Sequence, residues 1–183
     1  MPGKGHEAMG GANGGHDAHE SVEPGGLAGI ALADLFERFD GGDNHWHASI
    51  QSLLDGLTAE QALWRPAPER HCIWQIVRHM SFWRRYVIAH LEQAPLPDPQ
   101  TGDWSDPPDL DEDSWKKERE EYNRTQARLL EVVRPLIGSQ LTGVVGEEGE
   151  TRLYHWVAGL LAHDSYHAGQ IAYLRAMQGI PVA

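Results

Sequence analysis

Apolar residues recur every three or four positions in several segments of the chain, which is the spacing of one buried face of an α-helix. Residues 27–39 predict a short amphipathic helix, which the Asp-Gly-Gly-Asp-Asn run at 40–44 ends. A second helix is expected to start at Asp43 or Asn44, as its N-cap, and to end near Leu57. Its apolar positions are Trp46, Ile50, Leu53, Leu54 and Leu57.

Three longer segments, 72–91, 114–134 and 152–178, carry the same helical pattern. The Thr58–Gln61 run has the spacing of a capping box and predicts a short helical turn before the first of them. Residues 94–113 hold five prolines and seven acidic residues and are predicted to form a surface loop. Convincing β-alternation and internal repeats are lacking in the sequence, so the pattern favours an all-α fold, a four-helix bundle.

The two ends of the sequence differ in composition, which suggests one domain with a tail. Residues 1–26 contain eight glycines and three histidines, and almost no large apolar side chain. Such a segment buries too little surface to offset its ordering entropy, so we expect a flexible tail. Residues 27–183 are then a single bundle domain, with a small hairpin or turn expected within the connector at 135–150.

The charge balance excludes some classes of partner. The chain has 15 basic and 27 acidic residues, a formal charge of −12, whereas phosphate contacts require clustered Lys and Arg. We therefore expect neither a nucleic-acid partner nor a membrane partner, and the chain has no apolar run near the roughly 20 residues that span a bilayer. Cys72, the single cysteine, excludes an internal disulfide and Cys-rich metal sites. This composition and the lack of an apolar leader segment favour a cytoplasmic protein.

Histidine is abundant, with 11 residues in the chain, and one pair has a chelating spacing. His163 and His167 are four residues apart in the last predicted helix, so both rings emerge on one face. That face also carries Leu160 and Ile171, so both imidazoles should point into the bundle. A buried imidazole needs a partner, and a transition metal is one solution.

A third ligand is expected from a facing helix. His79 is the best candidate, because it lies on an apolar stripe with Ile76, Met80 and Trp83. His47 shares a helical face with Ile50 and is the preferred additional pocket residue, as a proton shuttle or as a donor to a metal ligand. A pair of histidines at this spacing also occurs by chance, and the rings then bond to each other and to backbone groups.

Four stretches of this chain resemble the DinB/YfiT-like superfamily of metal-binding four-helix bundles. They are Trp46–Ser49, Leu57–Pro66, His71–Trp83 and His163–Ile171, and they lie between residues 45 and 178. The resemblance implies a three-histidine metal site whose ligands, carried over residue by residue, are His79, His163 and His167. The superfamily includes thiol-dependent S-transferases and isomerases that use small bacterial thiols, and many members have no known activity.

The sequence thus leads to a metal-dependent enzyme as the first hypothesis. The cofactor would be a divalent transition metal, with zinc or nickel expected, and the substrate a small molecule with a small thiol as co-substrate. A metal-dependent hydrolase is the close alternative. A non-catalytic metal-binding or ligand-binding stress protein, and a purely structural bundle, also remain open. A homodimer is the expected assembly because it is the commonest one.

Overall fold

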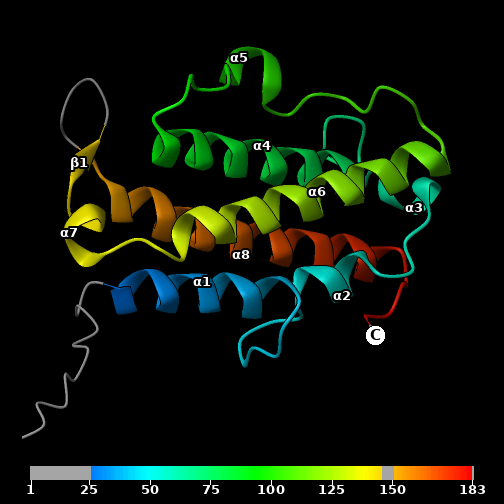
Figure 1. Ribbon diagram of the computed structural model, residues 1–183. Coiled ribbons are helices and arrows are strands. Elements are labelled where there is room, and N and C mark those ends of the chain that lie inside the picture. The colour runs from blue at the N-terminus through cyan, green and yellow to red at the C-terminus, as the bar shows by residue number, and fades with distance from the viewer. Residues whose placement is uncertain (1–25, 146–150, 183) are drawn as a thin grey trace, which may run out of the picture.

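Four long helices form the bundle in the computed structural model, which describes residues 26–145 and 151–182. They are α1 (Gly26–Asp40), α4 (Ile73–Glu92), α6 (Glu112–Val133) and α8 (Leu153–Met177) (Figure 1). Helix α4 packs against α6 and α8, and α1 packs against the same two helices, so each helix has two neighbours. The predicted all-α four-helix bundle is confirmed. No helix in the described ranges is both long and apolar enough to cross a membrane.

Shorter elements connect the long helices. They are α2 (Ile50–Leu54), α3 (Ala59–Leu63), α5 (Pro99–Gly102), α7 (Gly138–Leu141) and the antiparallel strands β1 (Val144–Val145) and β2 (Thr151–Arg152). The two strands confirm the hairpin expected in the connector at 135–150. The segment containing α5 lies along the outer side of α4 (Figure 1). The predicted tail lies, for residues 1–25, outside the described residues.

Local signals set the ends of the helices. Helix α4 begins after Cys72, whose backbone N–H donates to Gln75 Oε1 at 3.3 Å, and it ends at Gln93 in the left-handed conformation, with φ 55°. The N-cap of α6 is Asp111, which accepts from the backbone N–H of Ser114 at 2.8 Å. The helix therefore starts two residues before the predicted segment 114–134. Helix α8 ends where predicted, before Gly179, which has φ 69°.

The predicted start of the second helix is wrong. Helix α2 begins at Ile50 with Ser49 as its N-cap. Asn44 instead accepts hydrogen bonds through Oδ1 from the backbone N–H groups of Trp46 and His47, at 3.1 and 3.0 Å. These are the contacts of an N-cap, as expected for Asn44, but the turn does not continue as a helix. Trp46 is 81% exposed and is not part of the core.

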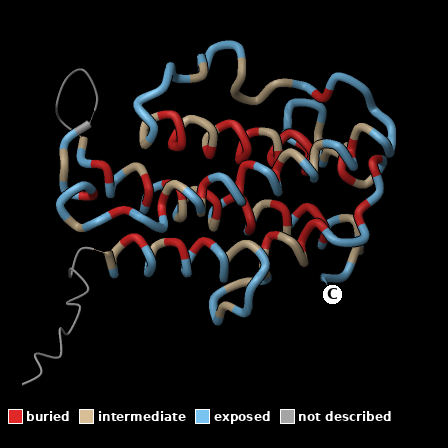
Figure 2. The backbone as a smooth tube through the Cα atoms, viewed as in Figure 1, coloured by how far each residue is buried: buried red, intermediate tan, exposed pale blue. Residues whose placement is uncertain are grey.

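Buried residues lie along all four long helices (Figure 2). The apolar ones form two clusters, one toward each end of the bundle. In α4 the first cluster ends at Met80 and the second begins at Val87. Helix α8 passes through the clusters in the opposite order, so that its part of the second cluster ends at Leu160 and its part of the first begins at Ala168. Buried polar residues lie between these limits on both helices. They are Ser81, Arg84, Asp164 and His167. This polar layer is where α4 and α8 carry the predicted ligands.

A buried ion pair joins α4 to α8 within the polar layer. Arg84 and Asp164 are 1% and 3% exposed, and Arg84 Nη2 lies 2.8 Å from Asp164 Oδ2. The same nitrogen donates to the hydroxyl of Tyr122 at 2.6 Å, and Tyr122 donates to Asp40 at 2.7 Å. Burial by itself lowers the pKa of Arg84, but the nearby Asp164, Tyr122 and Asp40 raise it by more. The pKa is therefore above its usual value, and the guanidinium stays charged.

Replacing Arg84 with methionine should destabilise the bundle strongly, because it leaves the Asp164 carboxylate buried without its cation. We expect Arg84→Met to lower the free energy of unfolding by about 3–5 kcal/mol in urea denaturation. Arg85→Met is the matched control, since Arg85 makes an exposed pair with Glu121, and should change it by less than about 1 kcal/mol. Equal losses in the two variants would contradict this role of Arg84.

Candidate metal centre

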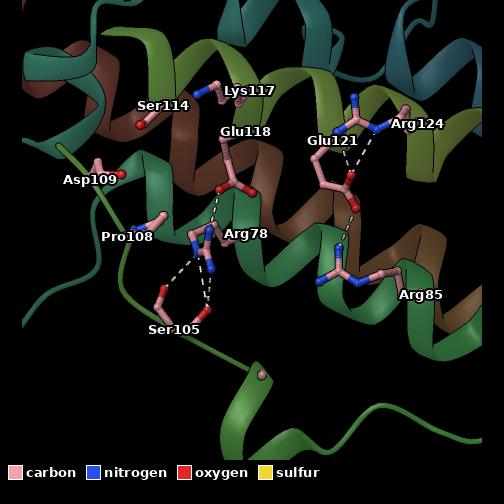
Figure 3. A pocket seen from close by; sticks show the side chains of 11 residues that line it. Arg78, Arg85, Ser105, Pro108, Asp109, Ser114, Lys117, Glu118, Glu121 and Arg124 are labelled. Carbon is pink, nitrogen blue, oxygen red and sulfur yellow. Dashed lines mark hydrogen bonds and ion pairs between the residues drawn. The ribbon is translucent and has the colours of Figure 1, made fainter. Parts of the chain in front are cut away.

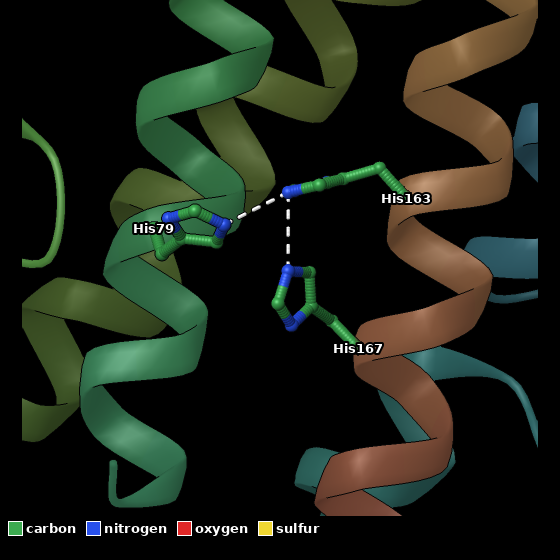
Figure 4. Close-up of side chains that lie close together, drawn as sticks. All are labelled: His79, His163 and His167. Atoms are coloured by element: carbon green, nitrogen blue, oxygen red, sulfur yellow. Dashed lines mark hydrogen bonds between the residues drawn. The ribbon is translucent and has the colours of Figure 1, made fainter. Parts of the chain in front are cut away.

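Helices α4 and α8 bring three imidazoles together in the polar layer (Figure 4). His79 Nε2 lies 2.8 Å from His163 Nε2, which lies 3.1 Å from His167 Nε2. His79 and His167 are buried, at 6% and 3% exposure, whereas the side chain of His163 is 26% exposed. The three residues selected from the sequence therefore form one cluster, and their ring nitrogens lie within 4.8 Å of one another.

Each ring has an oxygen acceptor at its other nitrogen. His79 Nδ1 contacts Asp103 Oδ1, His163 Nδ1 lies 3.3 Å from Asp164 Oδ1, and His167 Nδ1 lies 2.7 Å from Gln170 Oε1. Carboxylate and amide oxygens only accept hydrogen bonds, so these contacts assign the ring proton to Nδ1. Neutral rings in this tautomer present unprotonated Nε2 atoms, which lie within 4.8 Å of one another.

This donor set fits a transition-metal ion. With all three rings protonated at Nδ1, the Nε2 atoms 2.8 and 3.1 Å apart have no proton between them, and a metal ion would compensate their lone pairs. Zinc binds imidazole nitrogens at about 2.0–2.1 Å, so its ligands have to lie as close together as these nitrogens do. Histidine ligands also characteristically donate the second ring N–H to an oxygen, as all three do here. His79, His163 and His167 are thus the residues that could hold an ion.

Burial keeps two of the three candidate ligands, His79 and His167, in the neutral form that metals require. Burial, followed by the proximity of His163, lowers the pKa of His167 to about 4. Burial also lowers the pKa of His79 and outweighs the opposing effect of Asp103. Both rings are therefore neutral near pH 7 without a metal, and no proton has to be removed from them when one binds.

The loop after α5 covers one side of the centre. Trp104 stacks on His79 with ring centroids 3.7 Å apart, and on its other face it stacks on His71 at 3.8 Å. Trp104 has φ 51°, a conformation that is strained for a bulky residue and is typical of functional sites. Trp104 thus lies over one side of the three imidazoles.

Sequence reasoning missed Asp103 as a partner of the centre and undervalued Asp164. Asp103 lies 24 residues from His79 in a loop, and the acidic composition of that loop was its only signal. Asp164 directly follows His163 in the chain, and it contacts the Nδ1 atom of His163 and the buried Arg84.

The structure does not bring His47 to the three imidazoles. Its ring packs edge-on against Phe39, with centroids 4.8 Å apart, and its Nδ1 lies 2.8 Å from the carbonyl oxygen of Ala48. Together with Arg84 and Asp164 it lines a cavity of about 10 Å³. His47 thus lies behind Asp164 rather than beside the converging nitrogens, and its catalytic role stays a prediction.

Two larger pockets lie near the centre, and they differ in chemistry. A groove of about 420 Å³ is bordered by His71 and Gln170, which contact Trp104 and His167. The rest of its lining is mostly apolar, from Pro66, Ala67, Ile76, Tyr173, Leu174 and Met177, with Arg70 as the other polar residue. The other pocket, of about 500 Å³, lies between α4 and α6 and has charged walls (Figure 3). Those charges pair with each other, as Arg78 does with Glu118 and Arg85 with Glu121.

Comparison with known families agrees with this architecture. The family model of the DinB superfamily matches residues 32–171, which include all three histidines. The chain therefore belongs to the DinB superfamily. A search of curated proteins finds no match.

A direct test of the centre is metal binding by the full chain with His6, His16 and His19 replaced by alanine, so that the tail contributes no ligands. We expect about one Zn²⁺ per chain, because three converging imidazoles form one site. His163→Ala should abolish this binding, whereas His155→Ala, at an exposed position of the same helix, should retain it. Isothermal titration calorimetry and elemental analysis measure both. Zinc binding that survives His163→Ala would rule out this centre.

Proposed function

We propose that this protein is a metal-dependent enzyme, and specifically an S-transferase that joins a small thiol to an electrophilic substrate. The observation that carries the proposal is the cluster of three imidazoles whose ligand nitrogens lie within 4.8 Å of one another, with the side chain of His163 26% exposed. Three protein ligands leave coordination positions open, which is characteristic of catalytic rather than closed structural metal sites.

A divalent ion held by these nitrogens supplies Lewis acidity, which favours the deprotonated form of a thiol or water that reaches its open positions. In an S-transfer the sulfur forms a bond to the electrophilic carbon, and the thiol proton and the leaving group are released. The three rings are held in orientation by their contacts with Asp103, Asp164 and Gln170. Trp104 excludes water from one side of the centre.

The thiol has to be a co-substrate. Cys72 is the only cysteine of the chain, it is completely buried, and burial raises the pKa of its thiol. It is therefore a packing residue rather than a nucleophile. The mostly apolar groove beside Gln170 supports an electrophile with an apolar body, since small-molecule sites combine apolar walls with a few polar groups.

Hydrolysis is the second candidate, because the same open positions accept water as well as a thiol. The homodimer stays a prediction, as does the absence of a nucleic-acid partner.

The test of the activity combines Zn²⁺-loaded protein, a panel of low-molecular-weight thiols and an alkylating reagent whose thioether product fluoresces. We expect thiol-dependent turnover that His163→Ala reduces to the uncatalysed rate and that His155→Ala leaves unchanged. Ester and amide substrates assayed without a thiol test the hydrolase. Zinc binding without turnover in either assay would favour a non-catalytic metal-binding protein and would contradict the transferase.

The groove makes a separate prediction about specificity. Met177 lines it and is 48% exposed, so Met177→Glu should be tolerated by the fold but should place a charge in an apolar wall. We expect KM for an apolar electrophile to rise about tenfold, which corresponds to about 1.4 kcal/mol, while the zinc content stays the same. An unchanged KM would show that the substrate binds elsewhere.

A further inference from the structure

One of the three candidate ligands, His79, has its hydrogen-bond acceptor outside its own helix. The acceptors of His163 and His167 are Asp164 and Gln170, which lie on α8 within three residues of the ring they contact. The acceptor of His79 is Asp103, which is 24 residues away in the loop after α5. The orientation of His79 therefore depends on where this loop lies, whereas that of the other two rings depends on their helix alone.

The segment Gly102–Asp106, which we term the clasp, is tied to α4 by consecutive residues. Gly102 packs so closely on Phe82 that a Cβ atom there would lie 2.6 Å from the ring. The backbone oxygen and the hydroxyl of Ser105 accept from Arg78, at 3.0 to 3.3 Å. Asp106 accepts from Gln75 at 2.8 Å.

The two residues in the middle of the clasp both contact the ligand His79. The Asp103 carboxylate, 18% exposed, accepts from its Nδ1, and the Trp104 ring stacks on its face. The ring is thus held by its edge and by its plane, and both contacts leave Nε2 directed at His163. The backbone of Trp104 is in the left-handed conformation, and its indole ring lies between the imidazoles of His71 and His79.

We infer that Asp103 is a positioning residue for His79, through which the clasp sets the affinity of the centre for its metal ion. This inference rests on the proposed metal site and adds to it a determinant located outside the bundle helices. A carboxylate that accepts the second ring N–H fixes the tautomer of a ligating imidazole, raises its basicity and prevents rotation of the ring. Ring orientation matters more here because the described part of the chain offers this centre three ligands, each of which carries a large share of the affinity.

The test measures the Kd for Zn²⁺ by competition with a chromogenic chelator, using the full chain without its three tail histidines. We expect Asp103→Ala to raise Kd by about 10–100-fold. Asp103→Asn should raise it less, because the amide oxygen still accepts from Nδ1 without the charge. Asp109→Ala, at an exposed position of the same loop, should leave Kd within about twofold of the parent, since surface substitutions have small effects.

Asp106→Ala separates positioning of the ligand from general loosening of the loop. It removes a tie of the clasp to α4 but no contact with His79. The same variants loaded with Co²⁺ provide a second readout, because its visible absorption reports the geometry of the ligands. We expect Asp103→Ala to change this spectrum and Asp106→Ala to preserve it.

The inference fails if Asp103→Ala binds Zn²⁺ as tightly as Asp109→Ala, or if Asp103→Ala and Asp106→Ala weaken binding equally. If the parent chain binds no Zn²⁺, the proposed function itself is wrong and the positioning role falls with it. Circular dichroism of the metal-free variants checks the fold, and Asp103→Asn, the smallest change of the set, keeps the comparison decisive if Asp103→Ala does not fold.

Discussion

The ion pair between Arg84 and Asp164 is the interaction on which the arrangement of the bundle depends. It is buried, it connects α4 to α8, and it lies next to the metal ligands, since Asp164 follows His163 directly in the chain. A charged pair in a low-dielectric interior tolerates little displacement, because separation leaves both charges without compensation. It therefore fixes the position of α4 relative to α8 along the direction of their axes. The distance between His79 and His163 follows from that register.

The same physical requirement organises the rest of the polar layer. Buried polar groups are costly without partners, and several of them here are linked in chains that cross the bundle. Arg84 donates a hydrogen bond to Tyr122, which donates one to Asp40 on α1. His79 contacts Asp103 in the loop after α5. The centre is consequently part of a layer that contacts all four long helices, rather than an insertion between two of them. One apolar cluster lies on each side of this layer along the bundle.

Much of this structure follows from local sequence signals. The long helices are predictable because their apolar spacing and their end signals agree, as at Gly179. The triad is predictable because each histidine interrupts an apolar stripe, which depends only on position along its own helix. The start of α2 was not predictable from spacing, since Asn44 makes the contacts of an N-cap and yet the helix begins only at Ile50. Asp103 and Arg84 act across the fold, and no periodicity within one segment indicates such partners.

The burial of Cys72 has a practical consequence for anyone who searches for the substrate. Reagents that modify thiols, and electrophiles that accept them, normally also alkylate the enzyme under study. In this protein the single sulfhydryl has no exposed surface, and its raised pKa leaves little thiolate to react. Mixtures of many thiols and electrophiles can therefore be screened against the intact chain, and a covalent adduct found by mass spectrometry would report on chemistry other than cysteine alkylation.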